Sequence, residues 1–493
     1  MTQPTYLFYD LETTGLNKCF DQVLQFAAIR TDLALNEIAR HHINVRLNCD
    51  VIPAPTALLT HRMKLQDIQT GQPEIDAMRE IHQLMNTPGT ISLGYNTLGF
   101  DDELLRFSFY RNLLSPYTHQ YANQCKRMDL YPITTLYYLF KPDSLQWPIR
   151  DGKISLKLEN LIQENQLTTG PAHNAMVDVT ATLALAKKFI QHEEMWHYVI
   201  GYFDKHIDIQ RCVALPMSFE SSALKFHESL IIHGNFGSHL HYQVPALSLG
   251  QHQYYKNQSL WLRLDSETLQ QTTPETIPTT TYVIRKRAGE QPIVLPTFNR
   301  FLAHLSPERQ ELANANKAWL QTQSHLLAHI CDYHQTYQYP PVKNLDIDAA
   351  LYDIGFPSPQ EEKLFQQFHT VPPHEKEKIV TQFPNPIRQQ QALRLLGRHY
   401  PKLLSQESRS QFAEYLKNID SGEEKFLSTD YKNQPRLTSH QALQEILHLK
   451  KEISGAGEIQ NGKNQLRDEE QLQLLTELES YLLNRRTCAD FFL

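Results

Sequence analysis

The stretch that decides the fold reads Tyr6-Leu7-Phe8-Tyr9-Asp10-Leu11-Glu12-Thr13-Thr14-Gly15, an apolar strand pattern that ends in two carboxylates. Side chains alternate across a strand, so Asp10 and Glu12 point to the same side, about 7 Å apart along the chain. Like charges this close raise each other's pKa unless a cation neutralises them. The pattern therefore indicates a site for a hard cation such as Mg²⁺ or Mn²⁺. The alternative is a helix start, because Asp and Thr after a strand often cap helices.

A second acidic segment follows the apolar run 90–93, which the pattern predicts to be another strand. Residues 94–103 read Gly-Tyr-Asn-Thr-Leu-Gly-Phe-Asp-Asp-Glu and lead into a helical pattern over 104–111. Asp101 therefore lies where a strand passes into a helix, a position that suits a metal-ligating carboxylate. It also suits a helix N-cap, and for this segment alone the cap is the favoured interpretation.

The third segment places a histidine five residues before a carboxylate. Residues 171–179 read Pro-Ala-His-Asn-Ala-Met-Val-Asp-Val, and apolar residues recur at helical spacing from Met176 onward. Asn174 is expected to cap this helix, which leaves His173 in the preceding loop. Five helical residues turn by about 500°, so His173 and Asp178 can converge only if His173 lies outside the helix. A lone histidine is more often structural, but this one accompanies two other acidic motifs.

Taken together, Asp10-x-Glu12, Asn96-x3-Phe100-Asp101 and His173-x4-Asp178 resemble the three motifs of the DEDDh (DnaQ-like) 3′→5′ exonucleases. The chain is also similar to the bacterial exodeoxyribonuclease I family in length and nearly end to end, most closely over the first 190 residues. The segments that carry this similarity are 100–103, 109–112, 141–148, 172–176, 351–356 and 398–401.

The resemblance implies processive 3′→5′ hydrolysis of single-stranded DNA to 5′-mononucleotides by a two-metal mechanism, in DNA repair and recombination. Asp10, Glu12 and Asp178 would be the main ligands of two Mg²⁺ ions, which Mn²⁺ can replace, and Asp101 would complete the site directly or through water. His173 would be the general base that takes a proton from the attacking water, since its ordinary pKa of about 6.5 suits that role.

Strand binding requires cations and aromatic rings close to this site. The formal net charge of −7 and the pI near 6.4 argue against a protein that coats duplex DNA, but a narrow groove can be basic on an acidic protein. Basic and aromatic residues alternate between the second and third motifs, although each taken alone is more often packing or solvated surface. This set comprises Arg106, Arg111, Tyr117, Tyr121, Lys126, Arg127, Lys153 and Lys157.

Within this set, the resemblance implies contacts to single-stranded DNA by Arg106, Tyr117, Tyr121 and Lys157. Lys157 stands where the family usually has Arg. It keeps the positive charge, but an ammonium cannot bind a phosphate through two parallel hydrogen bonds as a guanidinium does. The residues expected beside the 3′-terminal nucleotide are Thr13, Thr14 and Leu16. The family also binds the acidic C-terminal tail of single-stranded-DNA-binding protein, and Lys141 is the matching basic position here.

The fold class expected is α/β, in three domains: a ribonuclease-H-like exonuclease domain over 1–192, an SH3-like β domain with helical insertions over 195–352, and an α-helical C-terminal domain over 353–486. The division follows the apolar patterns, which alternate between strand and helix first, then give short β runs, then helices. Strands are expected near 6–10, 22–30, 40–47 and 90–95. The helices expected in the first domain lie near 74–86, 101–113, 128–140, 156–164 and 175–191.

Other features bound the function. There is no apolar run of 18 residues and no basic-plus-apolar leader, so we expect a soluble, cytoplasmic protein without a membrane partner. Six scattered cysteines without a CxxC pair argue against zinc sites and against a disulfide framework. Asp102 and Asp129 are interpreted as helix caps, and Asp21 and Asp50 have no informative context. The family implies a monomer.

Three rival interpretations remain. A DEDDh exoribonuclease has the same motifs, but the enzymes of that kind are shorter chains without the extra domains. A polymerase proofreading subunit also has them, but it lacks the segments that match exodeoxyribonuclease I. A non-catalytic scaffold that only binds single strands would be expected to have lost a ligand, whereas all five catalytic positions are filled here.

Overall fold

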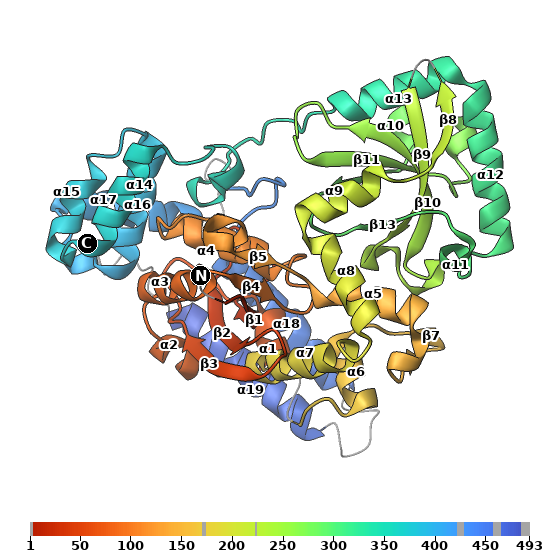
Figure 1. Cartoon of the computed structure of the whole chain (residues 1–493). Coiled ribbons are helices and arrows are strands. Elements are labelled where there is room, and N and C mark those ends of the chain that lie inside the picture. The colour runs from red at the N-terminus through yellow and green to blue at the C-terminus, as the bar shows by residue number, and fades with distance from the viewer. Residues whose placement is uncertain (1–2, 170–173, 222–223, 422–427, 457–464, 485–493) are drawn as a thin grey trace.

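The structure is a computed structural model, which describes residues 3–169, 174–221, 224–421, 428–456 and 465–484. Along the chain it forms a first sheet with its helices, a second sheet with its helices, and a helical region (Figure 1). This α/β organisation confirms the fold class that the sequence predicts.

The first sheet has five strands in the order β3-β2-β1-β4-β5. β1 pairs antiparallel with β2 and parallel with β4, and β4 pairs parallel with β5. The strands are β1 (Thr5–Thr13), β2 (Val23–Thr31), β3 (Glu37–Asn44), β4 (Thr90–Leu93) and β5 (Lys126–Arg127). The helices of this part are α1 (Pro55–His61), α2 (Leu65–Thr70), α3 (Glu74–Met85), α4 (Asp101–Arg111), α5 (Leu130–Phe140), α6 (Leu158–Asn165), α7 (Ala175–Phe189), α8 (Glu193–Ile200) and α9 (Lys205–Val213).

The alternation of β1 sends its side chains into two separate cores. Tyr6 and Phe8 pack with helices α5, α7 and α8 on one face of the sheet. Leu7 and Tyr9 pack with α3 and α4 on the other face. Asp10 and Glu12 have the parity of Tyr6 and Phe8, so they point to the face that α7 covers. The strand pattern thus decides which helix can supply a third carboxylate.

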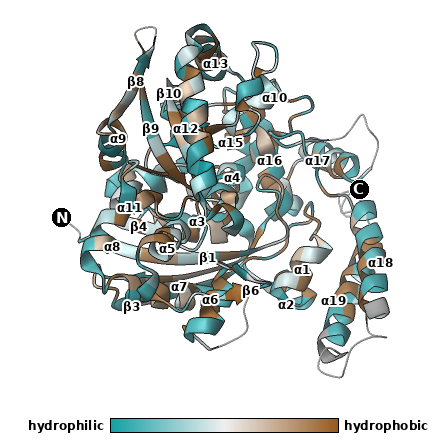
Figure 2. Cartoon of the chain, turned by 90° about the vertical axis from the view of Figure 1, so that its right-hand side faces the viewer, coloured by the Kyte–Doolittle hydropathy of each residue, from teal (hydrophilic) through white to brown (hydrophobic). Residues whose placement is uncertain are grey.

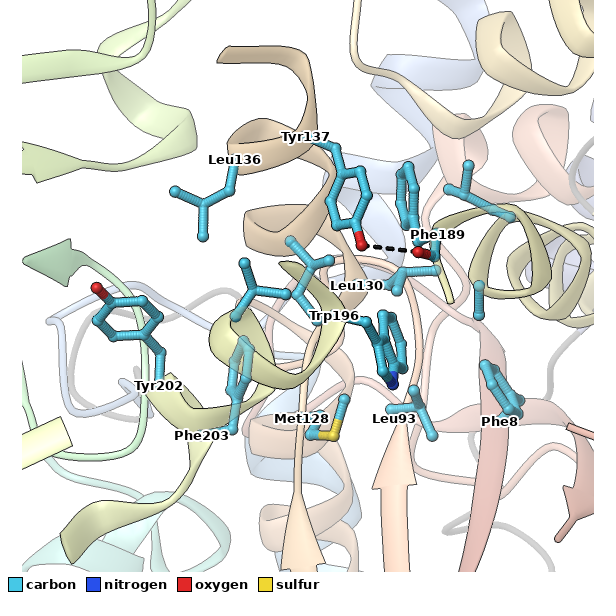
Figure 3. Close-up of a cluster of buried hydrophobic side chains, with 14 of the residues drawn as sticks. Phe8, Leu93, Met128, Leu130, Leu136, Tyr137, Phe189, Trp196, Tyr202 and Phe203 are labelled. Atoms are coloured by element: carbon cyan, nitrogen blue, oxygen red, sulfur yellow. Dashed lines mark hydrogen bonds between the residues drawn. The ribbon is translucent and has the colours of Figure 1, made fainter. Parts of the chain in front are cut away.

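The core on the α7 face combines aromatic and aliphatic side chains, and Figure 3 shows part of it. The hydroxyl of Tyr137 donates a hydrogen bond of 2.7 Å to the carbonyl oxygen of Phe189, so the last turn of α7 is tied to α5. Aromatic side chains bury large apolar areas, and such a core holds the helices rigidly against the sheet. Other residues of this cluster are Phe8, Leu93, Leu130, Trp196 and Phe203.

The second sheet has six antiparallel strands, with the path β12-β11-β10-β9-β13 and β8 added beside β9. Its strands are β8 (Met217–Ser221), β9 (Leu224–Ile232), β10 (Gln243–Gln251), β11 (Gln258–Arg263), β12 (Val283–Arg287) and β13 (Ile293–Leu295). Its helices are α10 (Ile277–Thr280), α11 (Asn299–Leu302), α12 (Pro307–Thr322) and α13 (Ser324–Thr336). Leu230 and Ile293 join the apolar core around α5, so this sheet and the first share apolar packing.

The helical region contacts the first sheet at two places. Helices α14 and α16 bury apolar residues against Ile75 of α3, and α18 and α19 pack on Leu58 of α1. Figure 2 shows α18 and α19 side by side below α17. The helices are α14 (Pro359–Thr370), α15 (Lys376–Val380), α16 (Pro386–His399), α17 (Gln406–Ile419), α18 (Ser439–Ala456) and α19 (Gln465–Asn484).

Several short elements were missed by sequence reasoning. The short helices α1 and α2 and the two-residue strand β5 lack the length that gives a clear period. A two-stranded hairpin, β6 (Ile149–Arg150) with β7 (Lys153–Ile154), was missed for the same reason.

The caps expected at the helix starts have mixed outcomes. Asn174 and Asp129 accept backbone N–H groups at the starts of α7 and α5, as predicted. The prediction that Asp102 caps α4 is wrong. Phe100 occupies the cap position without a side-chain hydrogen bond, and Asp102 is a fully buried residue inside the first turn, where it pairs with arginines.

Two further observations bear on the sequence expectations. Within the described ranges, no helix combines the length and apolar character that crossing a bilayer requires. Within those ranges, Cys19, Cys125, Cys212 and Cys331 are free thiols.

Candidate active site

Three carboxylates converge at the end of β1. Asp10 and Glu12 come from the strand and Asp178 from the first turn of α7, and one oxygen of each lies within 4.8 Å of the others. Asn174 fixes the start of α7 because its side chain accepts hydrogen bonds from the N–H groups of Met176 (3.2 Å) and Val177 (3.4 Å). The cap therefore sets which residue of α7 faces the strand.

The electrostatics of this trio favour a bound cation. Burial raises the pKa of Asp10 well above its ordinary value, and the charges of Asp101, Glu12 and Asp178 raise it further. Burial, then the charges of Asp178 and Asp101, raise the pKa of Glu12 to about 8. Three ionised carboxylates are thus strongly disfavoured here without a compensating charge. A divalent cation with oxygen ligands supplies that charge, so the residues fit a hard metal ion.

Asp101 begins α4 and lies next to the trio, although it is not part of the 4.8 Å group. Burial raises its pKa to about 8. The loop before it is held by Asp129, whose carboxylate accepts the N–H groups of Asn96 (2.8 Å) and Leu98 (3.0 Å). Asp129 therefore has a second task besides its cap, because it anchors the segment that carries Asp101.

The predicted general base, His173, lies outside the described residues, as does the rest of the segment 170–173. The description of the chain resumes at Asn174, the cap of α7. His173 as the base therefore stays a prediction.

An open groove of about 880 Å³ begins at Asp178 and runs between the first sheet and the second. Its walls come from the β6–β7 hairpin, the start of α6 and residues 234–242, which connect β9 to β10. Gly234 lets the two parts approach, since a Cβ there would lie 2.2 Å from Tyr131 Cε1. The cations of the lining are Arg150, Lys153 and Lys157, and its aromatic rings are Tyr95, Tyr131 and Tyr242.

This lining has the composition that single-stranded nucleic acid needs, with cations for phosphates and rings for bases. Sequence reasoning anticipated Lys157 and Lys153. It missed Arg150 and the three tyrosines, because only the folded chain brings the hairpin and the second sheet to Asp178. Gly234 was missed as well, because a glycine beside a polar loop does not by itself indicate a groove.

The residues predicted beside the 3′ nucleotide have different surroundings. Leu16 is 83% exposed and free to contact a ligand. The hydroxyl of Thr13 donates to the carbonyl oxygen of Gly15 (2.8 Å). Thr14 is fully buried, with its hydroxyl donating to Asp21 (2.7 Å) and its carbonyl accepting from Ala54 N–H (2.7 Å). Thr14 and Asp21 thus shape the loop that carries Leu16, a task for which Asp21 gave no sequence signal.

Arg106 and Tyr117 lie together, with the guanidinium 5.8 Å from the ring centroid. Arg106 is mostly buried, and its Nε is 3.2 Å from Asp102 Oδ2. Tyr121 is 62% exposed. Lys141 directly follows α5; its side chain is 38% exposed and its ammonium lies 3.3 Å from Asp143.

Comparisons with known proteins agree with this architecture. The family model described as exonuclease matches residues 7–186, and the exonuclease I C-terminal domain model matches residues 345–485. The exodeoxyribonuclease I of Escherichia coli (strain K12) is 36% identical over 208 residues, which cover 41% of this chain and 44% of that protein. The Haemophilus influenzae protein of the same name is 34% identical over 37% of this chain and 39% of its own. These alignments span less than half of the relatives' lengths.

Solved structures share the fold over the whole chain. E. coli exonuclease I in complex with a dT13 oligonucleotide has a TM-score of 0.81 at 22% identity, covering 98% of this chain and 100% of that one. A zinc-bound form of the E. coli complex with single-stranded DNA has a TM-score of 0.79 at 22% identity, covering 99% of this chain and 100% of the other. A structure of single-stranded-DNA-binding protein and exonuclease I with an inhibitor has a TM-score of 0.78 at 22% identity, and the match covers all of both chains. The exonuclease family is metal-dependent.

Proposed function

Because this chain belongs to the exodeoxyribonuclease I family, we propose that it hydrolyses single-stranded DNA processively from the 3′ end and releases 5′-mononucleotides. The observation that carries the proposal is the carboxylate trio at the mouth of a groove lined by cations and tyrosines. Such an enzyme would serve DNA repair and recombination.

The site residues divide the chemical work. Asp10, Glu12 and Asp178 would hold two Mg²⁺ ions, which Mn²⁺ can replace, and Asp101 would complete the ligand set directly or through water. When bound, these ions supply a nucleophilic water at neutral pH and neutralise charge on the phosphoryl oxygens. His173 would accept the proton of the attacking water.

Strand binding would use both sides of the groove. Lys157 at the start of α6 would contact a phosphate, and Leu16 would lie against the terminal nucleotide. Arg106, Tyr117 and Tyr121 would guide the strand farther from the site. Thr14 would act through the loop it holds, and Thr13 would contact the nucleotide from the end of β1.

The remaining proposals concern the whole protein. Lys141 would bind the acidic C-terminal tail of single-stranded-DNA-binding protein through its ammonium. We place the domain boundaries at 1–192, 195–352 and 353–486, of which 485–486 lie outside the described residues. A monomer in the cytoplasm is the expected state, testable by light scattering and by fractionation of cells.

The deciding experiment compares matched single strands of DNA and RNA and a blunt DNA duplex, all labelled at the 5′ end, with Mg²⁺ or with EDTA. The proposal expects rapid shortening of single-stranded DNA, abolished by EDTA and by Asp10→Ala, with the duplex resistant. If RNA were shortened equally fast, the chain would be an exoribonuclease as well. Tight binding without cleavage would favour a scaffold and overturn the proposal.

A further inference from the structure

Three consecutive acids at the start of α4 point to three different parts of the molecule. Asp101 lies beside the carboxylate trio, Asp102 is fully buried toward β5, and Glu103 faces the segment that leads into the helical region. Figure 1 shows α4 and β5 in the middle of the molecule, between the second sheet and the helical region.

Asp102 connects α4 to the second sheet through Arg127 of β5. Asp102 Oδ2 accepts a hydrogen bond of 2.6 Å from Arg127 Nη1, and Arg127 Nη2 pairs with Glu290. The other carboxylate oxygen, Oδ1, is 3.0 Å from Nε2 of the buried His119. Both oxygens of Asp102 are therefore held, and one of the ion pairs leads out of the first sheet.

Glu290 lies in the connection between β12 and β13, which several hydrogen bonds and an ion pair hold in place. Lys286 is buried and donates to the carbonyl oxygen of Glu290 (2.8 Å) as well as pairing with Asp208 of α9 (2.7 Å). Asp208 also accepts the N–H of Gly289 (2.7 Å), whose φ of +78° suits glycine. The second sheet thus presents Glu290 to Arg127 from a fixed turn.

Glu103 makes the corresponding connection to the helical region. Its Oε1 accepts hydrogen bonds from the hydroxyls of Tyr352 (2.6 Å) and Tyr431 (2.8 Å). Its Oε2 pairs with Lys18 (2.6 Å), in the loop after β1. The ring of Tyr431 stacks on Phe107 of α4, with centroids 5.8 Å apart and planes within 6°.

These contacts matter for Asp101 because it stands outside the 4.8 Å trio. A carboxylate outside that group can bind the same cation only if α4, which carries it, is held close to β1 and α7. Residues that orient metal ligands commonly affect metal affinity almost as much as the ligands do.

We propose that Asp102 and Glu103 are positioning residues through which the second sheet and the helical region set the place of Asp101 relative to Asp10, Glu12 and Asp178. Metal binding and turnover then require that both the second sheet and the helical region contact α4 as they do in this structure. This inference rests on the proposed function, and it assigns the second sheet and the helical region a role in positioning Asp101.

The test uses two variants on opposite sides of α4, both far along the chain from the trio. Glu290→Gln removes the charge that faces Arg127, and Tyr431→Phe removes one hydroxyl that faces Glu103. The matched control is Glu37→Gln, which breaks the exposed pair with Arg40 on β3 (2.9 Å). Mn²⁺ affinity is measured by calorimetry on the full chain without DNA, alongside kcat, KM and Tm.

We expect each test variant to bind Mn²⁺ about 10-fold more weakly and to lose about 10-fold in kcat, with KM within about 2-fold of wild type. The control should match wild type in Mn²⁺ affinity, kcat, KM and Tm. Wild-type Mn²⁺ affinity in both test variants would overturn the proposal, and a fall in Tm alone would show a merely structural role. If the wild-type chain hydrolysed no DNA, the proposed function would fail, whereas the Mn²⁺ titrations would still judge the coupling.

Discussion

Arg398 of α16 donates two hydrogen bonds to Asp50, which lies 348 positions earlier in the chain: Nε and Nη2 are 2.9 Å and 2.7 Å from Oδ2. Arg398 also pairs with Asp348 (2.5 Å), and Arg436 lies 3.3 Å from the same carboxylate. Asp50, Asp348 and Arg398 are almost fully buried. This ionic cluster fastens the helical region to the first sheet.

Replacing Asp50 by Ala should cost about 3–5 kcal/mol in the free energy of unfolding, because it leaves buried arginine charge uncompensated. Urea denaturation of the wild type and the variant measures this difference. The control is Asp32→Ala, because the partly exposed Asp32 carboxylate accepts hydrogen bonds from Asn36 within its own turn. A cost below about 1 kcal/mol for Asp50→Ala would contradict the assignment.

The same cluster predicts acid sensitivity. Burial alone would raise the pKa of Asp50, but the charges of Arg398 and Arg436 outweigh it and hold that pKa below its ordinary value. A carboxylate with a lowered folded pKa stabilises the fold above its unfolded pKa of about 3.9, and that stability is lost as the pH falls toward the folded pKa. Stability should therefore fall steeply below about pH 4. Asp50→Ala should flatten that slope in urea titrations, and an unchanged slope would refute the linkage.

The metal site predicts the opposite pH dependence. Glu12 and Asp101 have folded pKa values of about 8, raised first by burial, so without metal they bind protons that the unfolded chain releases near pH 4. The stability of the metal-free protein should thus fall as the pH rises from about 4 to 8, and Mn²⁺ affinity should rise over the same range. Calorimetry in buffers of different ionisation enthalpy should detect proton release on binding. No proton release at pH 7 would contradict the raised pKa values.

Lys157→Arg should tighten the grip on the strand. The ammonium is exposed at the start of α6 in the groove lining, and a guanidinium there could hold a phosphate with two parallel hydrogen bonds. We expect KM for single-stranded DNA to fall about 2- to 5-fold with unchanged kcat and Tm. Lys187→Arg, in the last turn of α7, is the control. Equal KM values for the two variants would remove Lys157 from the interface.

His173→Gln should slow turnover by about 10²–10⁴-fold, because a general base contributes that much. Binding of DNA and of Mn²⁺ should stay at wild-type levels, since neither is assigned to His173. Fluorescence anisotropy and single-turnover kinetics separate these quantities. Near-wild-type turnover would assign the base to another group.

The parts of this molecule that the sequence predicts are those governed by local rules. The parity of β1 places Asp10 and Glu12 on one face, and the cap at Asn174 places Asp178 in the first turn of α7. Both rules act within a few residues, so they can be applied without knowing the rest of the fold.

The remaining features depend on contacts between distant segments. Asp102 is of a residue type that often caps helices. It is a buried ion-pair partner only because the fold places Arg127, which also pairs with Glu290, beside it. Likewise, Gly234 becomes part of a groove only because Tyr131 packs directly against it. Such contacts follow from how sheets and helices pack, which local patterns do not encode.

The central claim is tested most directly by the direction and product of cleavage. A single DNA strand protected by phosphorothioate links at its 3′ end is compared with one protected at its 5′ end, and the products are identified by mass spectrometry. The account predicts that only the 3′ block prevents degradation and that the unblocked 3′ end yields 5′-mononucleotides. Degradation of the 3′-blocked strand, or products longer than mononucleotides throughout, would contradict it.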